Sequence, residues 1–286
     1  MTKLKIKKQS QNLYLIRTFF SQCKTFLRFL VSSYVLRRDW ERNKEKVNEI
    51  YEKLRTEKKE NISNLSLENY VFGEDKLRWT LFDNRLSFGS HKSIHKRKLD
   101  IFEDIILKND LEQIIEFGSG DGRNILWLAK KFPNLKFIGL ELSQASVELS
   151  DIAAAKYALD NVSFFKIDLT DIDSYIQLLD KKTFVFTNHT LEEMPRIFNH
   201  PLEALKRSEV RKVALIEPVY IFSFSRVILD VSRILRIIYH DRLSGLIRFC
   251  KKNLSTTFDM EVIDLGIGIN PVNPSSLIIL SRKTKE

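Results

Sequence analysis

Short apolar runs alternate with helical patterns between residues 98 and 217. The runs of strand length lie at 113–117, 135–141, 162–168, 183–187 and 212–217. The helical patterns, whose apolar positions recur every three or four residues, lie at 98–109, 121–131, 143–159, near 171–180 and, as a pair, within 190–208. Alternation of this length is typical of βαβ units, which place parallel strands in one sheet with helices on both faces.

The C-terminal part of the chain changes this pattern. Two further runs near 259–265 and 276–282 have no helix between them, and their linker "GIGINPVNPSS" is rich in turn residues. Such a pair forms an antiparallel end to the sheet. The predicted fold is therefore α/β, a doubly wound, mostly parallel seven-stranded sheet with an antiparallel C-terminal strand and an N-terminal helical extension.

The first 90 residues lack this alternation of strand and helix patterns. Residues 13–36, "LYLIRTFFSQCKTFLRFLVSSYVL", have the apolar stripe of an amphipathic helix, and 39–60 are densely charged. Residues 61–90 mix aromatic and turn residues and predict an irregular cap. We therefore expect a basic helical extension and cap at 1–90, then a second domain at 91–286 with a basic helical insertion at about 220–252.

The formal charge of +10 is concentrated in two apolar segments. Residues 1–38 contain nine Lys or Arg and no acid, and 220–253 contain seven Lys or Arg against two acids. Basic residues interrupt both segments too often for a membrane-spanning helix. They could instead cover the substrate site as a lid, or lie on an anionic membrane surface through 13–36 and 220–252.

The location expected is cytoplasmic, with the inner membrane face as the possible surface. The two cysteines, Cys23 and Cys250, are far apart, which fits a reducing compartment and neither a disulfide framework nor a metal site.

The first predicted strand ends in the loop "QIIEFGSGDGRNI" at 113–125. Glycines at a strand end let the backbone turn sharply and approach a ligand closely. The dinucleotide fingerprint G-x-G-x-x-G would need glycine where Arg123 stands, and the phosphate-loop signature is absent. Glu116, two residues before Gly118, would repel a pyrophosphate and would suit a ligand with an ammonium group.

The stretch "EFGSGDG" resembles the first motif of class I S-adenosylmethionine (SAM)-dependent methyltransferases. That family places an acid at the end of its second strand for the ribose hydroxyls, which "FIGLELS" supplies as Glu141. It places another acid after the third strand near the adenine, which "VSFFKIDLTD" supplies as Asp168. The resemblance implies SAM as cofactor. The expected cofactor-binding residues are Glu116, Gly118, Ser119, Gly120, Gly122, Glu141, Leu142, Asp168, Leu169 and Asn188.

The fourth strand ends in "TFVFTNHTLEEMPR", where the family's methyl group is expected. This lacks the signature of the adenine, cytosine and amide N-methylating branches, and no carboxylate precedes Glu192 to hold a metal. His189 is the candidate general base, because its ordinary pKa of about 6.5 suits removal of a hydroxyl proton. Glu192 or Glu193 could orient it, and Glu217, at the end of the fifth strand, is expected to point toward the acceptor.

The preferred interpretation is O-methylation of a small hydroxylated or sugar-type acceptor, which could be lipid-linked. A nucleic-acid acceptor is disfavoured, since the basic segments resemble apolar helices more than a surface that tracks phosphates. Two alternatives stay open: an NAD(P)-dependent oxidoreductase on the same type of sheet, and a non-catalytic methyltransferase-fold adaptor at a membrane.

Overall fold

The computed structural model describes residues 62–73, 77–194, 197–219, 243, 245–270 and 273–284, with isolated positions between 13 and 58. Most of the predicted amphipathic helix at 13–36 and most of the basic insertion at 220–252 lie outside the described residues, so their lid or membrane role stays a prediction. No helix in the described part of the chain is both long enough and apolar enough to span a membrane.

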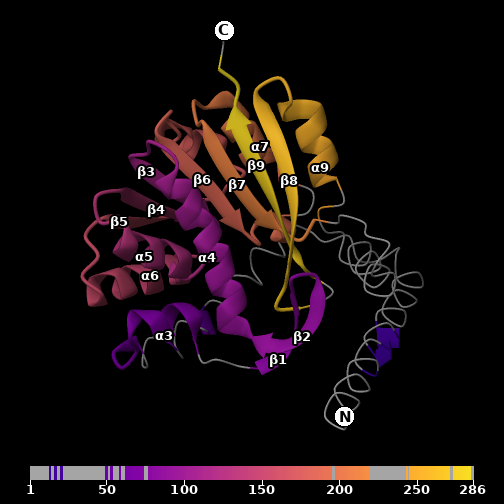
Figure 1. Ribbon diagram of the computed structural model, residues 1–286. Helices are drawn as coiled ribbons and strands as arrows, with labels where there is room; N and C mark the ends of the chain where they lie inside the picture. The colour runs from indigo at the N-terminus through magenta and orange to yellow at the C-terminus, as the bar shows by residue number, and fades with distance from the viewer. Residues whose placement is uncertain are drawn as a thin grey trace.

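A seven-stranded sheet forms the centre of the molecule (Figure 1). Its strands, in chain order, are β3 (Gln113–Phe117), β4 (Lys136–Glu141), β5 (Val162–Lys166), β6 (Thr183–Asn188), β7 (Lys212–Glu217), β8 (Phe258–Ile267) and β9 (Ser275–Arg282). Their spatial order is β5-β4-β3-β6-β7-β9-β8. β3 to β7 are parallel, whereas β9 runs antiparallel to both β7 and β8.

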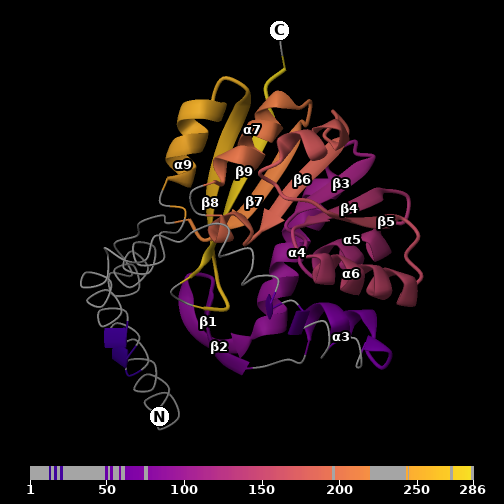
Figure 2. The ribbon, with the colours of Figure 1, turned by 180° about the vertical axis from the view of Figure 1, so that it is seen from behind.

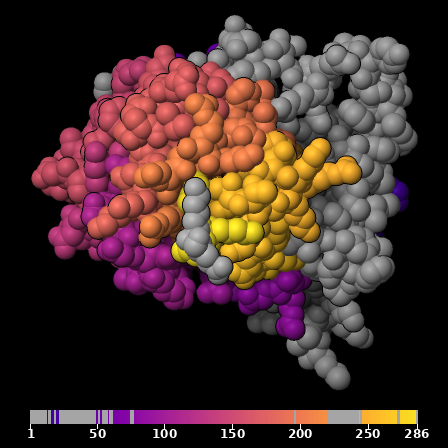
Figure 3. All heavy atoms as spheres, turned by 90° about the horizontal axis from the view of Figure 1, so that it is seen from above, coloured from indigo at the N-terminus to yellow at the C-terminus, as the bar shows by residue number. Residues whose placement is uncertain are grey.

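The sheet order confirms the doubly wound prediction. Strand order reverses at β3, which has β4 on one side and β6 on the other. In open sheets of this kind, ligands bind beyond the carboxyl ends of the strands at the reversal point. Seen from above, C-terminal residues (yellow) lie close to residues coloured orange, the colour of β7, in agreement with the pairing of β9 and β7 (Figure 3).

Two apolar cores pack on the two faces of the sheet. Figures 1 and 2 show the sheet and its covering helices from opposite sides. The first core is covered by α3 (Leu67–Phe72), α4 (His91–Leu107), α5 (Arg123–Lys131) and α6 (Gln144–Lys156). The second is covered by α7 (Asn199–Arg207), α9 (Leu246–Phe249) and the π-helical turn Cys250–Leu254 that follows it. Burial of these apolar faces is the main driving force that holds the layers together.

Parts of the chain differ from the sequence-based expectation. The stretch expected to be an irregular cap contains α3 and a two-stranded hairpin, β1 (Leu77–Phe82) and β2 (Arg85–Ser90). Residues Asp83 and Asn84 make its two-residue turn with positive φ, a conformation that Asn and Asp tolerate well. The stretches near 171–180 and 191–193 form short 3₁₀ turns, because few buried apolar residues there can support longer helices.

Candidate functional site

The loop after β3 is shaped by three glycines. Gly118, Gly120 and Gly122 all have positive φ, between 56° and 74°. A Cβ at Gly118 would lie 2.2 Å from Cγ2 of Thr190, so only glycine fits between β3 and the segment after β6. Gly122 is the residue before α5, and a Cβ there would meet the ring of Phe164 at 2.7 Å.

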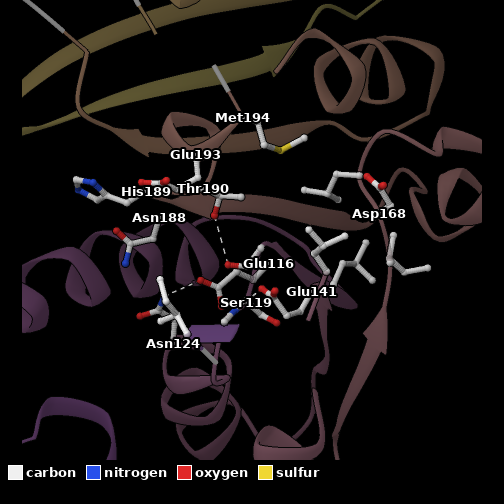
Figure 4. A pocket seen from close by; sticks show the side chains of 17 residues that line it. Glu116, Ser119, Asn124, Glu141, Asp168, Asn188, His189, Thr190, Glu193 and Met194 are labelled. Atoms are coloured by element: carbon white, nitrogen blue, oxygen red, sulfur yellow. Dashed lines mark hydrogen bonds between the residues drawn. The ribbon is translucent and has the colours of Figure 1, made fainter. Parts of the chain in front are cut away.

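A cavity of about 520 Å³ opens beside this loop at the carboxyl ends of β3, β4 and β6 (Figure 4). Its lining includes nine of the ten residues expected to bind the cofactor: Glu116, Gly118, Ser119, Gly120, Glu141, Leu142, Asp168, Leu169 and Asn188. Gly122 is the exception, because it lies in the turn that starts α5 and shapes the loop from behind. Figure 4 shows Asp168 at one end of the cavity, Asn188 and His189 at the other, and Glu116 between them.

Glu116 presents a carboxylate oxygen with no partner among the described residues. Its side chain is buried at the end of β3, and Oε1 accepts a hydrogen bond of 2.6 Å from Nδ2 of Asn124. The other oxygen, Oε2, is buried and has no hydrogen-bond partner. Burial raises the pKa of Glu116 well above its usual range, and the acids Glu141 and Asp121 add to the rise. A cationic donor placed at Oε2 would restore the charged form and satisfy this oxygen.

Glu141 connects the end of β4 to the glycine loop. Its Oε2 accepts from the backbone N of Gly120 at 2.8 Å, and its Oε1 accepts from the backbone N of Ser143 at 2.9 Å. Burial raises the pKa of Glu141, while these backbone donors oppose the rise. Each oxygen has a second lone pair, so the carboxylate can accept further hydrogen bonds from a ligand on the cavity side.

Asp168 lies after β5, at the far end of the cavity from His189. Its Oδ1 accepts from the backbone N of Thr170 at 3.0 Å and from the Thr170 hydroxyl at 2.7 Å. These contacts fix the orientation of the carboxyl group at the cavity wall.

His189 stands at the opposite end in a strained conformation. Its φ is +63°, which a non-glycine residue adopts rarely. Nδ1 lies 2.7 Å from Oε1 of Glu192, and Nε2 lies 2.8 Å from Oγ of Ser275 at the start of β9. Because a carboxylate accepts and does not donate, Glu192 keeps the proton of a neutral His189 on Nδ1, and Nε2 then accepts from the Ser275 hydroxyl.

The structure contradicts the expectation that Glu217 points toward the acceptor. Glu217 is fully buried behind the site, where Oε1 accepts from the Thr187 hydroxyl at 2.7 Å and from two backbone N atoms at 3.0 Å, those of Thr190 and Leu191. Burial raises its pKa to about 7. The carboxyl group therefore holds the turn that follows β6, and strand-end position alone could not distinguish this from a substrate contact.

Glu192 is likewise buried. Its Oε1 lies 2.7 Å from Nδ1 of His189, and its Oε2 accepts from Nδ2 of Asn273 at 3.4 Å. Its neighbour Glu193 lines the cavity.

Several residues at the site were missed from the sequence. Asn124, Thr190 and Met194 line the cavity. Ser275, which lies 86 positions after His189 in the chain, contacts the His189 ring. Asn124 could have been noticed, because it lies two residues after the last glycine of the loop, at the start of α5, where its side chain contacts Glu116. Ser275 carries no local signal. Within the described residues, no group of three or more His, Cys, Asp or Glu side chains could hold a metal ion.

Comparison with known proteins finds a family model that covers most of this site. Residues 108–224 match the model of a methyltransferase domain. This range contains the glycine loop, Glu141, Asp168 and the segment after β6. Over these residues the chain is similar to a methyltransferase domain.

Individual relatives match parts of this chain. A tRNA (guanine-N(7)-)-methyltransferase of Christiangramia forsetii is 30% identical over 104 residues, which are 36% of this chain and 42% of the relative. A protein of the same name from Helicobacter pylori is 35% identical over 69 residues, 23% of this chain and 17% of that protein. The chain thus spans less than half the length of the curated relatives that it matches.

Among solved structures, magnesium protoporphyrin IX methyltransferase from Synechocystis, with S-adenosylhomocysteine bound, superposes with a TM-score of 0.53. The match is 13% identical and covers 84% of this chain and all of the other. At this identity the likeness concerns the fold, and it agrees with the sheet order of the methyltransferase domain.

Proposed function

We propose that this chain transfers the methyl group of SAM to a hydroxyl group of a small hydroxylated or sugar-type acceptor, including a lipid-linked one. The observation that carries the proposal is the position of His189, at one end of the cavity and held between Glu192 and Ser275. A histidine oriented by a carboxylate at the methyl-facing strand end suits removal of a hydroxyl proton.

The residues of the cavity fit the cofactor group by group. The unpartnered Oε2 of Glu116 would accept from the ammonium of the amino acid end, as a charge-assisted hydrogen bond. Glu141 would accept from the ribose hydroxyls, and Asp168 would lie at the adenine end, with Leu142 and Leu169 as apolar neighbours. When bound, SAM supplies an electrophilic methyl group on a positively charged sulfur.

His189 would act on the acceptor. With its proton held on Nδ1 by Glu192, the Nε2 lone pair that now accepts from Ser275 becomes available to an acceptor hydroxyl beside it. Taking this proton as the oxygen attacks makes the oxygen a better nucleophile, which contributes typically 10²- to 10⁴-fold to a rate. Glu192 would be a positioning residue that sets the tautomer and stabilises the protonated ring.

The curated relatives favour a second candidate, methylation of a tRNA base. Both are named as tRNA (guanine-N(7)-)-methyltransferases, although they match only parts of this chain. Nucleic acid therefore stays open as an acceptor, against the sequence-based preference.

An acceptor screen with methyl-labelled SAM tests the proposal. The panel contains hydroxylated aromatics, sugars, sugar phosphates, lipid-linked sugars and unmodified tRNA. We expect label in a hydroxylated small acceptor, and His189→Gln should lower that rate about 100-fold while S-adenosylhomocysteine affinity stays within about twofold.

Label in tRNA alone would replace the proposal with the second candidate. Binding of S-adenosylhomocysteine with no methylation of any acceptor would favour the adaptor. A His189→Gln variant with unchanged turnover would remove the proton-accepting role from His189.

A further inference from the structure

A second cavity, of about 380 Å³, adjoins the first at Asn188 and His189, which line both. Its other walls come from α4, the start of α5 and the segment between β8 and β9. Because His189 Nε2 and the Ser275 hydroxyl lie on this side, a molecule in the second cavity would meet the methyl-transfer end of the first.

The second cavity is lined by hydrogen-bond donors and by cations. Lys98 and Arg123 provide positive charge, and Asn270 and Asn273 provide amides. None of the described residues that line it is acidic. Neighbouring acids are engaged in other contacts. Asp121 pairs with Arg123, and Glu192 and Glu217 are buried and hydrogen-bonded to residues of the segment that follows β6.

Lys98 is the unusual member of this set. It projects from the buried face of α4 with only 6% of its surface exposed. Its Nζ donates to Oδ1 of Asn188 at 3.3 Å, and no carboxylate of the described residues lies within 4 Å of it. Burial lowers the pKa of Lys98 to about 7, and Glu217 opposes the drop only from a distance. A buried ammonium without a paired anion is unfavourable, and an anionic ligand would remove the penalty.

His95 adds a neutral polar contact. Nδ2 of Asn124 donates to Glu116, so Oδ1 of Asn124 must accept, and it does so from Nε2 of His95 at 2.8 Å. Burial lowers the pKa of His95 to about 4, which keeps the ring neutral near pH 7. Because Arg123 is paired with Asp121, the positive charge available to a ligand in the cavity comes mainly from Lys98. The His95–Asn124–Glu116 chain links the two cavities.

We propose that the second cavity is the acceptor site and that it holds the acceptor by an anionic group, a carboxylate or a phosphate, with Lys98 as the main partner. The inference rests on the proposed methyl transfer for its role as an acceptor site. The anion would lie at the Lys98 side, with the acceptor's hydroxyl facing His189.

The test uses the full chain and two anionic probes, inorganic phosphate and benzoate, each titrated by NMR with and without S-adenosylhomocysteine. Benzyl alcohol is the neutral analogue of benzoate. We expect saturable binding of at least one anion, at least tenfold weaker binding of benzyl alcohol, and at least tenfold loss of anion affinity in Lys98→Met. Lys108→Met removes a charge from the exposed end of the same helix and should bind the anion within twofold of the wild type.

The two anions distinguish a phosphorylated acceptor from a carboxylated one, and the variants show whether Lys98 is the binding group. Tighter binding of phosphate indicates a phosphorylated acceptor, and tighter binding of benzoate indicates a carboxylated one. No binding of either anion to the wild type, or equal affinity in Lys98→Met, would overturn the inference. If Lys98→Met does not fold, Lys98→Gln removes the charge, keeps an amide donor and carries the same expectation. If the protein binds an anion through Lys98 but does not bind S-adenosylhomocysteine, the proposed function is contradicted. The anion site itself would then still be supported.

Discussion

The carboxylate of Glu116 has two oxygens in unlike surroundings. One is satisfied by Asn124, and the other is buried at the cavity without a partner among the described residues. A group in this position costs stability in the free protein, and a ligand with an ammonium recovers that free energy on binding. The acid and the glycines could be found from the sequence, because they are adjacent in it. The Asn124 contact depends on how α5 leaves the loop.

Lys98 makes the stability of the free protein depend on pH. Its pKa is about 7 in the folded chain against an ordinary value of 10.5, so between these values the unfolded chain binds more protons. The free energy of unfolding should therefore rise with pH in this window. Between pH 7 and pH 9, the free energy of unfolding of the wild type should rise by about 2 kcal/mol more than that of Lys98→Met.

Urea unfolding at the two pH values measures this gain. Lys108→Met serves as the control and should follow the wild type, because its side chain is exposed. Glu217 affects the free energy of unfolding at lower pH. Because its pKa is about 7 in the folded chain against an ordinary 4.5, the folded chain binds more protons between these values, and stability falls there as pH rises. Parallel pH profiles for the wild type and Lys98→Met would show that Lys98 is not a buried cation.

At the scale of elements, the glycine loop fixes where α5 begins. Gly122 precedes the helix with φ of +74°, and an added Cβ would meet Phe164 and Ser150 at 2.7–2.8 Å. Gly122→Ala should lower the free energy of unfolding by about 3 kcal/mol, from backbone strain and overpacking together. Gly245 holds the same position before α9 with φ of −104°, and its nearest atom to an added Cβ is 3.9 Å away.

Gly245→Ala is therefore the matched control, with an expected change within about 0.5 kcal/mol. Chemical denaturation compares both variants with the wild type. Equal effects of the two substitutions would mean that neither the conformation nor the packing at Gly122 matters for stability.

The strands of the seven-stranded sheet were predictable to within a few residues because each is an apolar run bounded by turn residues, whereas the hairpin of β1 and β2 was not predicted. The short turns near 171–180 and 191–193 were not, since helical spacing over a few residues is compatible with 3₁₀ geometry. The positive φ of His189 and the approach of Ser275 follow from how the segment after β6 meets β9. Contacts between distant segments leave no local pattern in the sequence.

At the scale of the molecule, sheet order explains why the two cavities adjoin. β3 and β6 are neighbours, and their carboxyl ends carry Glu116 and Asn188. β9 lies beyond β7 and supplies Ser275 at its start, on the same edge, because it runs antiparallel. The sheet order thus brings residues from three separate strands, β3, β6 and β9, to one edge of the sheet.

The most direct test of the account is calorimetric titration of the full chain with S-adenosylhomocysteine, which shares the amino acid end of SAM. We predict one-to-one binding, and in Glu116→Gln a dissociation constant raised about tenfold, equal to about 1.4 kcal/mol. Glu112→Gln, an exposed acid just before β3, should bind within about twofold of the wild type. Binding of NAD(P) without binding of S-adenosylhomocysteine, or equal affinity in Glu116→Gln, would contradict the account.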